Sequence, residues 1–139
     1  MRGVVSGEKV VFISGTGVPY NKVLFCRYPK GISGYMHIRI TSGFAYNRND
    51  CSSYDIVIYK PIGYEIEIIN VHRVVGIETR IMILDDGNYI NILLDQQYGN
   101  QVIPLIIEKI SIYNFDNAEL GNLKGYDSIP DGYVECNYS

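Results

Sequence analysis

Apolar and polar residues alternate with a period of two along much of the chain. In residues 35–41, Met36, Ile38 and Ile40 fall on one side of an extended strand and the residues between them fall on the other. Residues 54–59 repeat the pattern. No segment carries the 3.6-residue period of a persuasive amphipathic helix, so the pattern predicts a protein built from strands.

The most regular stretch, residues 64–94, contains the pair Asp86-Gly87 between two apolar runs. Asp-Gly is favoured in two-residue hairpin turns, where both central residues need positive φ. With this pair at the tip, Ile83 lies opposite Ile90, and the isoleucines two residues further out share their face. The predicted core consists of apolar strand positions: Phe12, Ile38, Ile40, Ile56, Ile58, Ile66, Ile81, Ile83, Ile90, Ile92 and Ile110.

Further strands are predicted at residues 10–13, 23–28, 64–77 with a bulge near residues 68–69, and 103–113. Residues 43–53 and 96–101 are polar and predict loops. Residues 116–124 could form at most one helical turn, because two glycines interrupt them. The expected fold is all-β: a single antiparallel β-sandwich or barrel of about seven or eight strands in residues 1–115, followed by a polar, acidic C-terminal tail or arm in residues 116–139.

Length and cysteine content limit the class of protein further. A chain of 139 residues suits one domain with its own core. Cys26, Cys51 and Cys136 are widely spaced, which predicts neither a disulfide framework nor a zinc site. No stretch approaches the roughly 20 apolar residues of a membrane span, and no export signal is evident. We therefore expect a soluble protein, cytoplasmic or virion-associated.

The net charge of -3 hides an asymmetry along the chain. Residues 1–61 carry eight basic and three acidic residues, a charge of +5, whereas residues 62–139 carry four basic and twelve acidic residues, a charge of -8. Such asymmetry can indicate an anionic partner for one half, complementary contact between copies, or only the interleaving of both halves in one folded surface. If the basic half met the acidic tail of another copy, deletion of residues 117–139 would give a folded monomer.

Catalytic chemistry is poorly represented. His37 and His72 are the only histidines, and no serine or cysteine stands in a nucleophile-elbow context. Glu65 and Glu67 share a face of the predicted strand, but alternating glutamates are typical of a solvated strand face. The sequence therefore predicts no enzyme, no cofactor and no metal.

Binding is better supported, because the chain has 13 tyrosines and no tryptophan. A tyrosine offers a large apolar body with a polar tip, which suits contact surfaces. We expect a non-enzymatic structural or interaction protein that acts through self-assembly or protein docking, with other copies of itself or another protein as partner. Such modules are typical of phage and virus structural components. The candidate interaction residues are Arg39, Phe44, Tyr46, Arg48, Tyr126 and Tyr133.

Two alternatives remain open. Aromatic and basic residues interleave in the first half, as in grooves for single-stranded nucleic acid. Residues 64–113 also resemble the first strands of an OB-fold, with a bulged strand, a second strand, an Asp-Asp-Gly turn and a third strand. The nucleic-acid contacts under this alternative are Lys22, Arg27, Tyr28, Lys30, Arg80 and Tyr89. A carbohydrate-binding β-sandwich is the second alternative, since tyrosines also stack on sugars.

Overall fold

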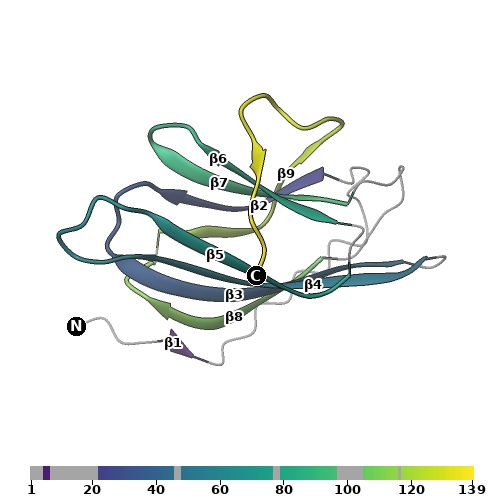
Figure 1. Ribbon diagram of the computed structural model, residues 1–139, viewed down its shortest axis with the longest axis horizontal. Coiled ribbons are helices and arrows are strands. Elements are labelled where there is room, and N and C mark those ends of the chain that lie inside the picture. The colour runs from purple at the N-terminus through teal and green to yellow at the C-terminus, as the bar shows by residue number, and fades with distance from the viewer. Residues whose placement is uncertain (1–4, 7–21, 46–47, 77–78, 97–104, 116) are drawn as a thin grey trace.

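A computed structural model describes residues 5–6, 22–45, 48–76, 79–96, 105–115 and 117–139. Over these residues the chain forms ten strands in two antiparallel sheets that pack against each other, and no helix (Figure 1). The prediction of an all-β antiparallel sandwich is confirmed. Three strands were not predicted: the two-residue strand at residues 5–6, and the strands at residues 119–126 and 134–135 in the expected tail. They bring the count above the predicted seven or eight.

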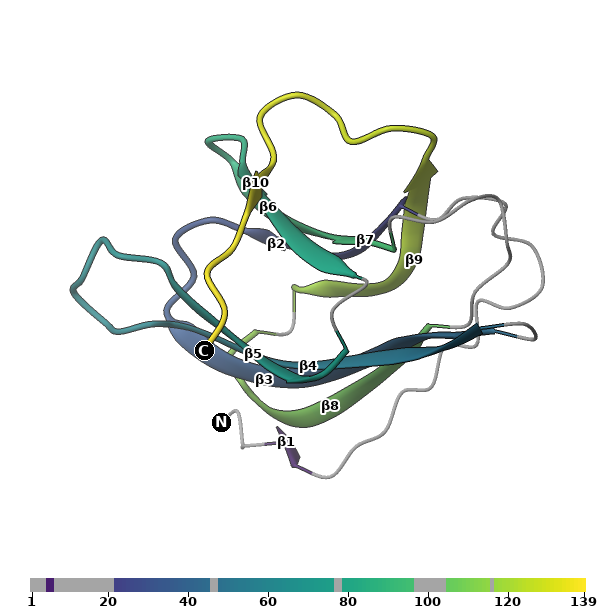
Figure 2. The same ribbon diagram turned by 45° about the vertical axis from the view of Figure 1, so that its right-hand side comes forward.

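Each sheet has five strands. Sheet A runs in the order β1 (Val5–Ser6), β8 (Ile106–Tyr113), β3 (Gly34–Ala45), β4 (Arg48–Lys60) and β5 (Ile68–Val75). Sheet B runs in the order β10 (Val134–Glu135), β6 (Arg80–Asp85), β7 (Tyr89–Asp95), β2 (Lys22–Pro29) and β9 (Glu119–Tyr126). Figure 2 shows sheet B above sheet A, with the chain passing between the layers several times.

The core lies between the sheets and follows the predicted alternation. Met36, Ile38 and Ile40 are fully buried, and so are their β4 partners. The rings of Tyr28 and Phe115 meet edge to face with centroids 5.2 Å apart, a favourable geometry for aromatic pairs. The confirmed core predictions are Ile38, Ile40, Ile56, Ile58, Ile81, Ile90 and Ile92.

Four predicted core residues have other outcomes. Phe12 lies outside the described residues. Ile83 is partly buried against the core. Ile66 is 62% exposed, so its prediction is wrong: the strand begins only at Ile68, and residues 61–67 form the β4–β5 loop. Ile110 is only partly buried, because a register shift in the β3–β8 pairing interrupts the alternation there.

The β6–β7 hairpin forms with a register two residues away from the predicted one. The two central turn residues are Gly87 and Asn88, because Asp86 N donates to Tyr89 O at 3.1 Å and only Gly87 has positive φ, +92°. Glycine at the first central position is typical of a type II′ turn. The Asp86 carboxylate accepts from the amides of Asn88 and Tyr89. Ile83 therefore pairs with Ile92, and the even shift leaves the predicted faces unchanged.

The prediction of a loop over residues 43–53 is wrong for residues 43–45 and 48–53, the part of this range that the structure describes. These residues belong to β3 and β4, with Phe44 opposite Asn49 and Ala45 opposite Arg48. Hydroxyl side chains pair across the strands instead of apolar ones; the Oγ atoms of Thr41 and Ser53 lie 3.3 Å apart. A polar strand stabilised in this way carries a loop-like composition.

The prediction that residues 116–139 lie outside the strand pattern is also wrong. Strand β9 pairs with β2, and β10 pairs with β6. An irregular register opposite β2, with Gly121 at φ +140°, interrupts the alternation that would reveal β9 in the sequence. Deletion of residues 117–139 would remove two strands, so we no longer expect it to leave the domain folded.

The last residues cross from sheet B to sheet A, as Figure 2 shows in yellow. Cys136 N donates to Ile81 O on β6 at 3.1 Å, and Ser139 N donates to Val71 O on β5 at 2.9 Å. Between them, the Tyr138 hydroxyl accepts from Ile81 N at 2.8 Å. This segment joins the edges of the two sheets.

Candidate interaction surface

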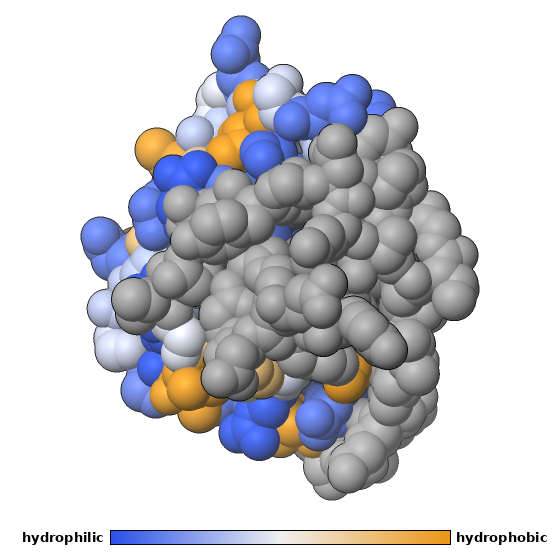
Figure 3. All heavy atoms as spheres, turned by 90° about the vertical axis from the view of Figure 1, so that its right-hand side faces the viewer, coloured by the Kyte–Doolittle hydropathy of each residue, from blue (hydrophilic) through white to orange (hydrophobic). Residues whose placement is uncertain are grey.

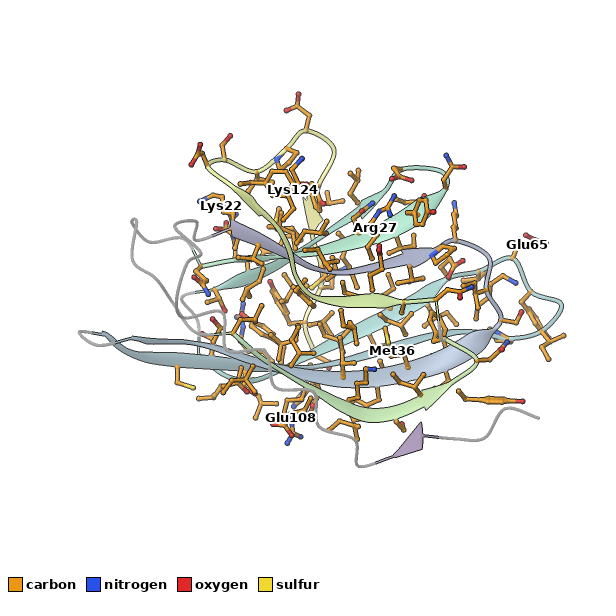
Figure 4. All side chains as sticks on the ribbon, turned by 180° about the vertical axis from the view of Figure 1, so that it is seen from behind. Lys22, Arg27, Met36, Glu65, Glu108 and Lys124 are labelled. Atoms are coloured by element: carbon orange, nitrogen blue, oxygen red, sulfur yellow. The ribbon has the colours of Figure 1, made fainter. Side chains whose placement is uncertain are left out.

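The outer face of sheet A is the side that points away from sheet B. Figure 4 shows Met36 between the sheets and Glu108 on the opposite side of sheet A. Glu108 pairs with Arg39 across β8 and β3, and neighbours opposite each other in a sheet share a face. Tyr35, two pleats from Arg39 on the same side of β3, therefore also lies on the outer face.

Three tyrosines and an isoleucine form one cross-strand row on this face. Tyr35 is opposite Tyr113 on β8 and opposite Tyr59 on β4, and Tyr59 is opposite Ile68 on β5. Side chains at such positions stand about 5 Å apart. Tyr35 is 37% exposed and Tyr113 is 45% exposed. We call these four residues the tyrosine row.

A glycine brings the two strands at one end of the row together. A Cβ at Gly34 would lie 2.6 Å from Tyr113 O and 2.8 Å from the Phe115 ring, closer than real side chains approach. Asn114, the one described residue other than glycine with positive φ, donates from Nδ2 to Ser33 O at 2.6 Å. The end of β8 is thus anchored to the start of β3, which holds Tyr113 beside Tyr35.

The β4–β5 loop, residues 61–67, carries three of the four most exposed large apolar side chains of the described residues; the fourth is Val134 on β10. Ile62 is 87% exposed, and Tyr64 and Ile66 are each 62% exposed. Figure 1 shows the loop projecting past the end of sheet A, and Figure 4 shows Glu65 at its far end. Tyr59 and Ile68 flank the loop in the chain, so loop and row adjoin.

The loop is closed by a local hydrogen bond at its start and joined to the β2–β3 turn at its end. Tyr64 N donates to Pro61 O at 3.3 Å, which closes the turn at its start. The Glu67 carboxylate accepts a hydrogen bond from Gly31 N in the β2–β3 turn. These contacts restrain the backbone of the loop that carries the exposed apolar side chains.

A charged cluster lies beside the tyrosine row on the outer face. Arg39 donates two hydrogen bonds to the Asp55 carboxylate, at 2.9 and 3.1 Å, and His37 Nε2 lies 3.4 Å from the same carboxylate. The hydrogen bond from Arg39 lowers the pKa of Asp55 below its usual value, and the same contact raises the pKa of Arg39. Arg39 and Asp55 therefore neutralise each other at the centre of the face.

We call the tyrosine row and the loop side chains together the tyrosine surface: Tyr35, Tyr59, Ile62, Tyr64, Ile66, Ile68 and Tyr113. Sequence reasoning missed all seven as interaction residues. The alternation of residues 35–41 already places Tyr35 on the side opposite the core. The register that aligns it with Tyr59 and Tyr113 depends on strands far apart in sequence, and no sequence signal reveals it.

The predicted interaction residues are scattered over the molecule. Arg39 lies on the same face as the tyrosine row, two pleats from Tyr35, whereas Tyr46 and the side chains of Phe44 and Arg48 fall outside the described residues. Tyr126 lies on β9, with Lys124 Nζ 5.2 Å from its ring centroid. Tyr133 is half-buried, and desolvation raises its pKa to about 12. Of the residues in this set whose side chains the structure describes, Arg39 shares the outer face of sheet A with the tyrosine row.

The predicted nucleic-acid contacts are mostly engaged within sheet B. Tyr28 is fully buried in the core, so the prediction that it contacts a ligand is not compatible with its position. Arg27 lies 3.5 Å from the Tyr89 ring centroid and 3.3 Å from Glu119 Oε2. The remaining cations also meet carboxylates: Lys30 meets Asp85 at 2.6 Å, Lys22 meets Asp95 at 3.5 Å, and Arg80 meets Asp95.

These ion pairs account for much of the charge asymmetry along the chain. Lys22, Arg27 and Lys30 come from the basic half, and their partners come from the acidic half. The two halves interleave in sheet B because β2 lies between β7 and β9. The asymmetry is thus largely balanced within one molecule.

Other site chemistries find little support in the described residues. No group of three or more histidine, cysteine, aspartate or glutamate side chains is placed to hold a metal ion among them. The three cysteines are unpaired, and burial raises the pKa of the Cys26 thiol. None of the described segments forms a helix long and apolar enough to cross a membrane.

The described residues therefore define an all-β sandwich in which the tyrosine surface combines exposed aromatic and aliphatic side chains. The chain matches no protein-family profile, no curated protein and no solved structure.

Proposed function

We propose that this is a non-enzymatic interaction protein that docks onto another polypeptide, either a copy of itself or a different protein, through the tyrosine surface. The observation that carries the proposal is the exposure of Ile62, Tyr64 and Ile66 on a loop held next to the tyrosine row. A role as a phage or virus structural component is one form of this proposal.

Burial of apolar area is the main favourable term in most protein association. Clustered exposed apolar side chains often mark interaction sites, and tyrosine is enriched in them. The anchoring of the loop through Glu67 and Gly31 reduces the entropy lost on binding. Figure 3 views the opposite end of the molecule, and the hydrophobic residues that are visible beside the grey atoms there form small groups among hydrophilic ones.

Nucleic-acid binding has weaker support from the geometry. Single-stranded nucleic acid requires cations that follow the phosphates, whereas Lys22, Arg27 and Lys30 are engaged with carboxylates. Arg39 is likewise bound to Asp55. Protein docking needs no surplus of positive charge, so it fits the surface better.

Site-specific photo-crosslinking tests the proposal. A photoreactive phenylalanine analogue is placed at Tyr64, or at Val134 on β10 as the control, which is 67% exposed. Illumination in an extract of the producing cells should give covalent adducts with a polypeptide from position 64 and far fewer from position 134. Equal adducts from both positions, or none with any polypeptide, would contradict the proposal.

A further inference from the structure

We infer that the tyrosine surface binds a second copy of this chain and forms a two-fold symmetric dimer. The inference rests on the proposed function and names the partner. Each copy would contribute the same residues, and the projecting β4–β5 loop of one copy would lie along the tyrosine row of the other.

The area of the surface is comparable with what a dimer needs. Taking about 150 to 200 Å² for a large side chain, the five most exposed residues of the tyrosine surface expose roughly 500 Å². A standard interface buries about 800 Å² on each partner. These five side chains alone therefore supply more than half of one side of such an interface.

The charges around the surface are mixed, which suits contact with an identical surface. Lys60 ends β4 and Glu65 lies in the loop, so both signs flank the apolar residues. Arg39 is paired with Asp55 and therefore adds no net charge. A nucleic acid would need a basic surface and a strongly basic protein would need an acidic one. A surface with both signs can place its own cations against its own anions in a two-fold contact.

The hydrogen-bonding and packing properties of tyrosine also favour contact with an identical surface. A tyrosine hydroxyl both donates and accepts hydrogen bonds, so two identical tyrosine rows can satisfy each other. Aromatic rings also pack favourably against each other in offset or edge-to-face geometry.

Association through strand edges, the other common route between copies of a β-protein, is hindered in the described strands. β1 and β10 have two residues each, and β9 has an irregular register. The middle of β5 is bridged by Tyr138 at Val71. Short, irregular and covered edges resist edge-to-edge pairing, which leaves the tyrosine surface as the better route.

Sedimentation velocity on the purified protein, from about 1 µM to about 500 µM, tests the inference. The unmodified protein should approach twice the monomer mass and then stop, because a two-fold contact is closed. The double variant Ile62→Ser with Tyr64→Ser should raise the dissociation constant at least tenfold. The control double variant, Leu123→Ser with Val134→Ser, removes two exposed apolar side chains from sheet B and should dimerise normally.

Circular dichroism and the urea midpoint should show that both double variants fold as the unmodified protein does. A monomer at about 500 µM, a continuing series of larger species, or equal weakening by the control would overturn the inference. If position 64 crosslinks to a different polypeptide while the pure protein stays monomeric, the proposed function stands and the second copy is excluded. If neither experiment shows contact with a polypeptide, both the proposed function and the dimer are contradicted.

Discussion

The outer faces of the two sheets differ although each sheet has five strands of the same sandwich. On sheet B, Lys22, Asp95 and Arg80 form one cross-strand row, and the Asp95 carboxylate meets both cations. On sheet A, the corresponding feature is a row of tyrosines that meets solvent. Sheet B thus pairs the charges of its row within the molecule, whereas Tyr35 and Tyr113 in the row of sheet A stay more than one third exposed.

The difference shows where charge acts in this protein. Asp95 is only 1% exposed, so its pairing with Lys22 and Arg80 replaces water that the folded chain has removed. The Arg39–Asp55 pair on sheet A is more exposed and contributes less. The buried ion pairs thus lie on sheet B, and the row on the outer face of sheet A is mainly aromatic.

The largest expected effect is on sheet B. Asp95→Ala should destabilise the protein by about 3 to 5 kcal/mol, because it leaves two cations facing a buried site without their carboxylate. Urea unfolding measures the change. Glu119→Ala breaks the exposed pair with Arg27 and should cost no more than about 1 kcal/mol. Similar losses for both variants would remove the proposed contrast between buried and exposed pairs.

A second prediction concerns residues 136–139, the C-terminal segment that joins the two sheets. Tyr138→Phe removes the hydroxyl that accepts from Ile81 N and donates to Glu135 at 2.9 Å. We expect a loss of about 1 to 2 kcal/mol by thermal or urea unfolding, since one partner is a partly buried amide. Tyr133→Phe, at a half-buried tyrosine of the same C-terminal segment, should cost less. The opposite order would show that the crossing segment adds little stability.

The third prediction concerns how the stability contributed by the Arg39–Asp55 pair of sheet A depends on pH. The pKa of Asp55 is lowered in the folded state, mainly by the hydrogen bond from Arg39, so its contribution is fully present above the unfolded pKa of about 3.9. The contribution disappears as the pH falls through the lower, folded-state pKa. Asp55→Asn should therefore cost about 1 kcal/mol at pH 7 and progressively less below about pH 4. A difference in urea stability that does not change between pH 7 and pH 3 would contradict this.

The smallest effect on stability is expected at the tyrosine surface itself. Ile62→Ser changes a side chain that is 87% exposed, so the free energy of unfolding should change by less than about 0.5 kcal/mol. Ile38→Ser, at a fully buried position of sheet A, should cost several times more. A large loss at Ile62 would mean that the loop serves the fold, and its exposure would no longer indicate a docking site.

The strand pattern and the facing of side chains could be predicted from the sequence. Met36, Ile38 and Ile40 alternate with polar neighbours, and this period is a local property of an extended chain. The predicted facing holds even where the predicted pairing is wrong. Ile83 lies opposite Ile92 instead of Ile90, yet it keeps its predicted face. An even shift of register changes partners without changing sides.

Local sequence patterns do not predict the strands that are polar or have an irregular register. Residues 43–53 read as a loop because hydroxyl groups occupy positions that apolar residues usually hold. Strand β9 was missed because the register irregularity and Gly121 interrupt its period. In both segments the strand is stabilised by its neighbours in the sheet, which the local sequence does not report.

The sequence alone determined that this chain folds from antiparallel strands and which side of the alternating strands, such as β3, faces the core, because alternation follows from the geometry of the extended backbone. Tertiary structure decided what lies on the outer sides. It brought Tyr113 beside Tyr35, 78 positions earlier in the numbering, and it placed Arg27 against Glu119. Such neighbours depend on strand order and long-range register, which the whole core selects together, so the tyrosine surface exists only in the folded molecule.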